Sequence, residues 1–141
     1  MIELQDYYMG RDAAYSTQLS TQMRRNALLT VELSNKMLVL VKTAGIALSA
    51  NPITKTIVSS GWRPPAVNEA TPGAAVHSKH LTCQAIDIYD PAGDIDTWLM
   101  TSAGQKALAD IGLWLEHPAA TKGWCHVQTV PPASKRRVFY P

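Results

Sequence analysis

The feature that most constrains the fold is a change of hydrophobic pattern part-way along the chain. From Thr21 to Ala44, apolar residues recur at the three- and four-residue spacing that marks one face of a helix. After Asn51-Pro52 this period is lost, and short β-branched or alternating segments follow, separated by proline and glycine. Helices that come first and strands that come later favour an α+β fold over repeated βαβ units. We therefore predict that N-terminal helices pack on a small, mostly antiparallel sheet, and that the 141 residues form a single domain.

The helical third of the chain has recognisable ends. The main helix is expected to begin with Thr21 as its N-cap and to stop at Gly45, with Lys42 in its last turn. A shorter helical piece is expected over Asp12–Leu19. The apolar stripe of the main helix is interpreted as core packing, because such stripes usually face a core. The stripe comprises Ala27, Leu28, Val31, Leu38 and Val41.

The rest of the chain predicts several short strands. They are expected at Thr56–Ser59, Cys83–Tyr89, Leu113–Glu116, Cys125–Val130 and, as an edge strand, Arg137–Tyr140. A long irregular loop is predicted over Ala66–Lys79, and loops of this length in compact domains are commonly functional. A helix through Trp98 is expected to be capped by Asp94 or Asp96. A turn is expected over Pro118–Gly123.

Composition excludes several classes of protein. Hydrophobic residues make up 46% and charged residues 17% of the chain, a globular mix that excludes a disordered or collagen-like protein. The formal net charge of +2 is too small to indicate nucleic acid as a main ligand. No apolar run approaches the roughly 20 residues of a membrane span, and the N-terminus lacks the basic and apolar regions of a signal peptide. Two cysteines suit a reducing cytosol. We expect a monomer that is made in the cytoplasm.

Three residues of the kind that binds zinc accompany the predicted strands. His80 comes just before one strand, Asp87 lies within it, and His126 lies in another. A carboxylate on a strand with alanine and isoleucine neighbours is costly unless a cationic group faces it, and a metal ion is one such group. Histidine nitrogen and aspartate oxygen are ordinary zinc ligands. Three protein ligands leave the fourth position open, as in catalytic rather than structural sites.

Three segments around these residues resemble the M15 zinc peptidases. Residues 78–87, SKHLTCQAID, resemble the S-x-H-x-x-G-x-A-x-D signature of that family. Upstream, SGWRPP at 60–65 is similar to the family's segment of Ser-Gly, an aromatic residue and arginine. Downstream, GWCHVQ at 123–128 is similar to the strand that carries the family's last histidine. The segments follow the family's order. Its members cut peptidoglycan stem peptides as D-Ala-D-Ala carboxypeptidases, dipeptidases and phage endolysins.

The resemblance implies a site and an activity. It implies one zinc ion held by His80, Asp87 and His126 on a Hedgehog/DD-peptidase-like α+β fold. It implies that Arg63 points at the substrate, where it stabilises negative charge or holds a terminal carboxylate, and that Ser78 lies in the substrate cleft. The implied function is a zinc metallopeptidase, carboxypeptidase or endopeptidase, that hydrolyses peptidoglycan stem peptides or crosslinks. The chain looks most similar to short phage-encoded lysis enzymes, which act on the cell wall after release from the cytoplasm or from the virion.

Two positions depart from the family's pattern. Cys83 stands where the signature has glycine, so a side chain must fit where many relatives have none. Gly123 stands three residues before the last histidine, where many relatives carry a carboxylate as general base. The nearest upstream carboxylate is Glu116, which would serve as the base if the loop after it folds back against the metal site. His117 and His77 are lesser candidates for the base.

The missing carboxylate keeps a second class of function open. In that alternative, the chain is a binding or virion-assembly module that keeps zinc as structure, with little or no catalysis. A third hypothesis is a zinc peptidase that cuts a different small peptide. Arg63 also has an alternative role, since it could stack on Trp62 or pair with Glu69.

The cysteines and the basic cluster are interpreted mainly as structural and surface features. A structural zinc site of two cysteines and two histidines is disfavoured. Cys125 and His126 are adjacent on a predicted strand, so their side chains point to opposite faces. Each cysteine is expected to be a small buried hydrophobe. The cluster Lys135-Arg136-Arg137 is expected to be a solvated edge, with a weak attraction to anionic cell-wall polymer or nucleic acid as the alternative.

Overall fold

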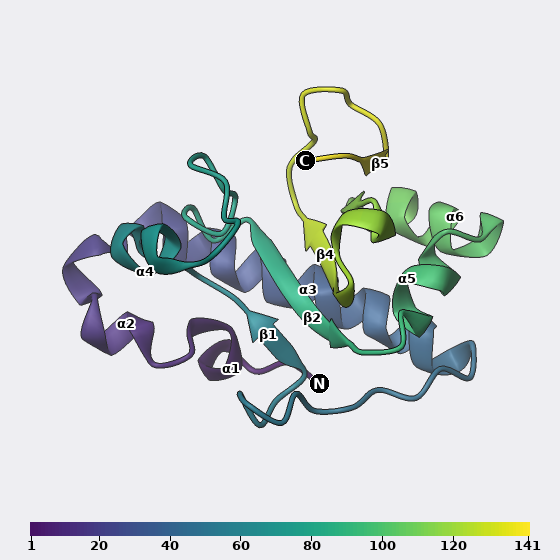
Figure 1. Ribbon diagram of the computed structural model, residues 1–141, viewed down its shortest axis with the longest axis horizontal. Coiled ribbons are helices and arrows are strands. Elements are labelled where there is room, and N and C mark those ends of the chain that lie inside the picture. Colours follow the sequence, from purple (N-terminus) through teal and green to yellow (C-terminus); the bar gives the residue numbers. More distant parts are fainter.

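A five-stranded sheet in the order β1-β2-β4-β3-β5 organises the molecule, and the computed structural model describes residues 1–141 (Figure 1). The strands are β1 Val58–Ser60, β2 Ala85–Asp90, β3 Trp114–Glu116, β4 Gly123–Gln128 and β5 Val138–Phe139. β2 and β4 pair antiparallel at the centre, β1 and β3 flank them antiparallel, and β5 lies parallel to β3 at the edge. This mostly antiparallel sheet, with its helices, confirms the predicted α+β class.

The helices leave one face of the central strands free. They are α1 Leu4–Tyr8, α2 Arg11–Ala14, α3 Thr21–Thr43, α4 Pro65–Ala70, α5 Asp94–Leu99 and α6 Ser102–Ile111, with short 3-10 helices at Ser16–Gln18 and Pro118–Ala120. The long helix α3 runs behind the sheet in Figure 1. One buried cluster joins Leu38 and Val41 of α3 with Ile86, Ile88 and Val127 of the sheet. Side chains alternate along a strand, so the residues that lie between these core positions on β2 and β4 point to the opposite face of the sheet.

The predicted ends of the main helix are partly right. The N-cap is Ser20, whose hydroxyl accepts a hydrogen bond from the Met23 amide at 3.1 Å, so the prediction of Thr21 is wrong by one residue. The stop at Gly45 is confirmed, because this glycine takes a left-handed φ of 88° just after the helix. The shorter piece expected over Asp12–Leu19 is divided between α2 and a 3-10 helix.

The prediction of a wholly irregular segment over 66–79 is wrong. Helix α4 begins at Pro65 and continues to Ala70. A proline at the first helical position removes only an N–H that would have no partner inside the helix, so it starts α4. The expected loop is therefore shorter and runs from the end of α4 to β2.

The prediction that Asp94 or Asp96 caps α5 is also wrong. The N-cap is Gly93, with a left-handed φ of 75°. The free amides of the first turn are satisfied from outside the helix, by the carboxylate of Asp90 at the end of β2. That carboxylate accepts hydrogen bonds from the Ile95 and Asp96 amides at 3.2 and 2.9 Å.

The strands were placed correctly, but their ends are shifted by a few residues. β2 begins at Ala85 rather than Cys83, because Cys83 takes a φ of 60° that no strand residue adopts. The predicted edge strand at 137–140 is confirmed as β5. The prediction of a solvated basic edge is wrong for Arg137, whose guanidinium lies 3.9 Å from the centre of the Trp114 ring. None of the helices has both the length and the apolar character needed to cross a bilayer.

Candidate metal centre

The loop that carries His80 is held on two sides. On one side, the Thr30 hydroxyl of α3 donates a hydrogen bond to the Cys83 carbonyl at 2.8 Å. On the other side, the Arg63 amide donates to the His80 carbonyl at 3.1 Å. His80 is buried, with 1% of its surface exposed. These contacts fix the histidine before β2 begins.

Cys83 shows why glycine suits its position in the signature. Its φ of 60° lies in the left-handed region, which costs a residue with a Cβ about 1–2 kcal/mol relative to glycine. The side chain is fully buried in the hydrophobic core, beside Tyr7. Burial raises the pKa of the Cys83 thiol to about 12, so the thiol stays protonated. The cysteine therefore acts as a core residue, as expected, and not as a metal ligand.

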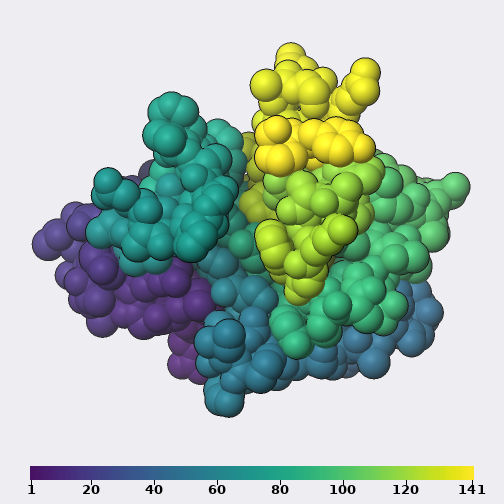
Figure 2. All heavy atoms as spheres, viewed as in Figure 1, coloured from purple at the N-terminus to yellow at the C-terminus, as the bar shows by residue number.

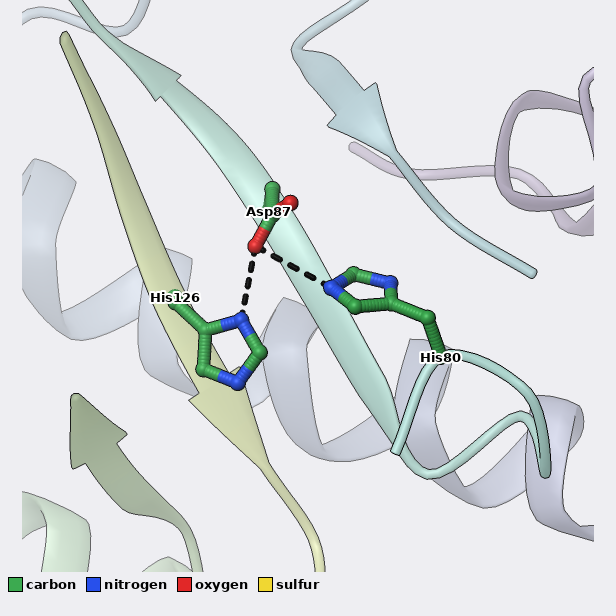
Figure 3. A group of neighbouring side chains, drawn as sticks. All are labelled: His80, Asp87 and His126. Carbon is green, nitrogen blue, oxygen red and sulfur yellow. Dashed lines mark hydrogen bonds and ion pairs between the residues drawn. The ribbon is translucent and has the colours of Figure 1, made fainter. Parts of the chain in front are cut away.

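Asp87 and His126 come together through strand pairing. The register of β2 and β4 places Asp87 directly opposite His126, so their side chains leave the same face of neighbouring strands. This face is the one turned away from α3, and Figure 3 shows both side chains reaching out from it towards His80. Residues that are 39 positions apart in the chain thus share one site.

The three side chains converge on a single oxygen atom. His126 Nδ1 lies 2.7 Å and His80 Nε2 lies 3.2 Å from Oδ1 of Asp87 (Figure 3). One ligand atom from each residue lies within 4.8 Å of the other two. His80 Nδ1 is 2.7 Å from the Gly61 carbonyl, so Nδ1 carries the proton and Nε2 presents its lone pair to the cluster.

The chemistry of this donor set fits a zinc ion. Nε2 of His80 is buried and has no hydrogen-bond partner, an arrangement that is costly unless something binds there. Two imidazole nitrogens and one carboxylate oxygen, with no fourth protein ligand, match the donor set of a catalytic zinc site. The expected ligands His80, Asp87 and His126 therefore lie where one ion can reach all three.

The electrostatics of the cluster favour a neutral His80 and an ionised Asp87, whereas Asp87 favours the protonated form of His126. Burial lowers the pKa of His80, which favours the neutral, metal-binding form. Burial also lowers the pKa of His126, but the hydrogen bond and charge of Asp87 outweigh this and raise it overall. Burial raises the pKa of Asp87, yet the two histidines hold it well below its usual range. Asp87 is therefore an anion that favours a cation between the two rings.

The segment before Arg63 is fixed by the N-terminal helices. The Trp62 amide donates to the Tyr7 carbonyl of α1 at 3.2 Å. A Cβ on Gly61 would lie 1.8 Å from that same carbonyl oxygen, so only glycine fits this close approach. The Arg11 guanidinium of α2 donates to the Trp62 carbonyl at 2.6 Å. Sequence reasoning missed Tyr7 and Arg11, because no motif links them to the segment that they support.

Arg63 lies at the edge of the cluster and pairs with Ser78. Its Nη2 donates to the Ser78 hydroxyl at 3.1 Å, while its Nε is buried without a partner. Its bonding partner is thus Ser78 and not Glu69. Burial lowers the pKa of Arg63, and the negative charges of Asp87 and Glu116 act in the opposite direction. The two residues expected to meet the substrate are therefore in contact with each other.

Glu116 lies beside the cluster, where the loop after it returns the chain to β4. Its Oε2 is 3.9 Å from Nδ1 of His126, and 17% of its side chain is exposed. The last β3–β4 pair joins Leu115 to Val127, so the next residue of β3 stands beside His126. Gly123 has a left-handed φ of 98° that disfavours any side chain there. The neighbouring strand thus supplies a carboxylate that β4 lacks.

Other candidates lie away from the cluster. His77 is exposed. His117 Nδ1 accepts a hydrogen bond from the Ala119 amide, and its ring stacks on Tyr140. His117 and Asp96 line a separate cavity of about 480 Å³. None of the three clustered residues lines this cavity. Figure 2 shows the surface hollowed between the teal segment with α4 and the yellow C-terminal segment.

Comparison with protein families agrees with the geometry. A family model described as Peptidase M15 matches residues 17–127. The chain belongs to the peptidase M15 family. The match includes the three clustered residues, Arg63, Ser78 and Glu116, and it leaves out β5. M15 membership makes the chain a peptidase and supports zinc as the ion for the cluster. No curated protein and no solved structure gives a significant match.

Proposed function

We propose that this M15 peptidase hydrolyses peptidoglycan stem peptides or crosslinks, with one zinc ion held by His80, Asp87 and His126. The observation that carries the proposal is the convergence of these ligand atoms on one oxygen, in a family of zinc peptidases. Zinc there would supply a Lewis acid that polarises the scissile carbonyl and lowers the pKa of water. On the resemblance alone, we extend the proposal to a phage-encoded lysis enzyme that leaves the cytoplasm at lysis or is carried in the virion.

Arg63 and Ser78 would hold the substrate. The guanidinium presents a planar fork that matches a carboxylate or a developing oxyanion, and burial strengthens such a contact. Its Nη2 is already oriented by the Ser78 hydroxyl, and its buried Nε lacks a partner. A substrate carboxylate or carbonyl oxygen at the cluster would therefore meet a donor that is fixed before binding.

Glu116 would act as the general base. Its carboxylate lies 3.9 Å from Nδ1 of His126, a proposed zinc ligand, and this supports a base that would reach the metal site through one water molecule. Burial raises the pKa of Glu116, although the charges of His126 and Arg63 act against this. A raised pKa makes a carboxylate a better proton acceptor. Glu116 would take the proton of the attacking water and deliver it to the leaving amine.

The proposal is tested by mass spectrometry of purified muropeptides incubated with zinc-loaded protein, beside a chelated control. A zinc-dependent loss of terminal alanine or a split crosslink is expected, and the products identify the bond. Glu116→Gln should lower kcat about 10²–10⁴-fold while zinc still binds. Glu69→Gln, on the exposed side of α4, is the matched control and should leave kcat unchanged. Bound zinc without any cleavage would instead support the binding or virion-assembly module.

A further inference from the structure

The backbone at Glu116 is held by β5 and not by β4. The ladder between β3 and β4 pairs Trp114 and Leu115 but does not extend to Glu116. On the other side, Glu116 is paired with Phe139 of β5. The Leu115 amide donates to the Arg137 carbonyl at 2.9 Å. The His117 amide donates to the Phe139 carbonyl at 2.7 Å. These two hydrogen bonds bracket Glu116.

Both ends of β5 are anchored to the strand that it supports. The Arg137 guanidinium lies 3.9 Å over the Trp114 ring, and its Nη1 donates to the Leu113 carbonyl at 2.8 Å. At the other end, the Tyr140 ring stacks on His117 at 4.5 Å between centres, with 13° between planes. A strand of two residues has few hydrogen bonds of its own, so these side-chain contacts fix its place.

The same segment also reaches a clustered residue. The Phe139 ring meets the His126 ring edge-on, at 6.3 Å between centres and 81° between planes. Phe139 is half-buried, whereas Lys135 and Arg136 before it are exposed. One residue of β5 therefore borders both the carboxylate strand and a histidine of the cluster.

We propose that residues 137–140, here named the C-terminal strap, position Glu116 for catalysis, with Arg137 as the anchoring residue. This inference rests on the proposed function of Glu116 as general base. A base works only within hydrogen-bond reach of the proton it takes, and a displacement of about 1 Å costs up to about 100-fold in rate. None of the three proposed zinc ligands lies on the strap, and only Phe139 borders one of them, His126. Arg137 contacts Trp114 and the Leu113 carbonyl instead, so its replacement should displace the base without removing the capacity for zinc. The strap lies outside the region that matches the family, 17–127.

The test compares Arg137→Ala with Arg136→Ala in the zinc-loaded protein of residues 1–141. Both variants remove one positive charge, but only Arg137 contacts the Trp114 ring of β3 and the Leu113 carbonyl just before that strand. Arg137→Ala should lower kcat on a stem peptide about 10–100-fold, with KM and zinc content little changed. Arg136→Ala should match the unmodified protein.

A double-mutant cycle separates positioning from general damage. In the Glu116→Gln background there is no base left to misplace, so adding Arg137→Ala should cause no further loss of kcat. Losses that multiply in the double variant would show that Arg137 acts independently of Glu116, and would overturn the proposal. An unchanged kcat in Arg137→Ala would overturn it as well.

Amide hydrogen exchange supplies a readout that needs no turnover. Arg137→Ala should speed the exchange of the Leu115 and His117 amides at least about tenfold, while the amide of Val127 on β4 keeps its rate. Unchanged exchange at both amides would show that the strap does not hold β3. If the unmodified protein cleaves no stem peptide, the proposed function fails, and the exchange result still decides whether the strap fixes the strand of Glu116.

Discussion

Asp96 predicts an unusual dependence of stability on pH. Its side chain is buried, with 3% exposed, and its Oδ1 has no hydrogen-bond partner. Burial raises its pKa from 3.8 to about 6, although hydrogen bonds from Cys125 and Thr121 act against this. Because the folded protein holds this proton more tightly than the unfolded chain does, ionisation favours unfolding. The two pKa values differ by about 2, and each pH unit is worth about 1.4 kcal/mol, so the cost is about 3 kcal/mol.

The direction in which ionised Asp96 changes the stability determines the pH range that the assay must cover. Asp96 costs no stability well below pH 4; the cost grows as pH rises and is nearly complete by about pH 7. Urea unfolding, followed by tryptophan fluorescence, should be measured across this range for the unmodified protein and for Asp96→Asn. The free energy of unfolding of the unmodified protein, minus that of the variant, should fall by about 2–3 kcal/mol between about pH 4 and pH 7. Asp94→Asn, which removes an exposed carboxylate from the same helix, is the control. A flat difference for Asp96→Asn would refute the reasoning.

Three further predictions concern the site and its supports. Zinc at about 100 times its Kd should stabilise the protein by about 2.7 kcal/mol, which is an increase of roughly 8 °C in Tm by calorimetry; His80→Ala should abolish the increase. Gly61→Ala should cost at least about 3 kcal/mol in urea unfolding, because its Cβ would lie 1.8 Å from the Tyr7 carbonyl oxygen; Ser60→Ala should cost much less. Arg63→Lys should raise KM about tenfold at unchanged zinc content, since lysine lacks the planar fork; an unchanged KM in steady-state kinetics would contradict a substrate role.

The sequence predicted best what depends on local pattern. The fixed period of two along a strand puts Asp87 on the face opposite Ile86 and Ile88, and the structure has it there. It predicted poorly what depends on distant partners. The cap of α5 is supplied by Asp90, which lies beyond the reach of the usual local capping pattern.

The carboxylate near the cluster shows the same difference between what local pattern predicts and what tertiary contacts decide. The sequence identified Glu116 as the candidate but left its location conditional, because its distance from His126 depends on how β3 pairs with β4. No rule of spacing relates residues on neighbouring strands joined by a loop. Phe139 and Tyr7 were missed for the same reason, since each acts on the site only through tertiary contact.

The contact between α1 and Gly61 has a consequence for the design of truncated fragments of this chain. The family match begins at residue 17, yet Tyr7 and Arg11, which hold the Trp62 backbone, come before it. A fragment cut to the matched boundaries would keep all three candidate ligands and could still take up metal. It would lose the two contacts that hold the backbone next to Arg63. The Arg63 guanidinium would then no longer be a fixed donor for the substrate. Metal content would therefore be a poor criterion for judging whether such a fragment is intact.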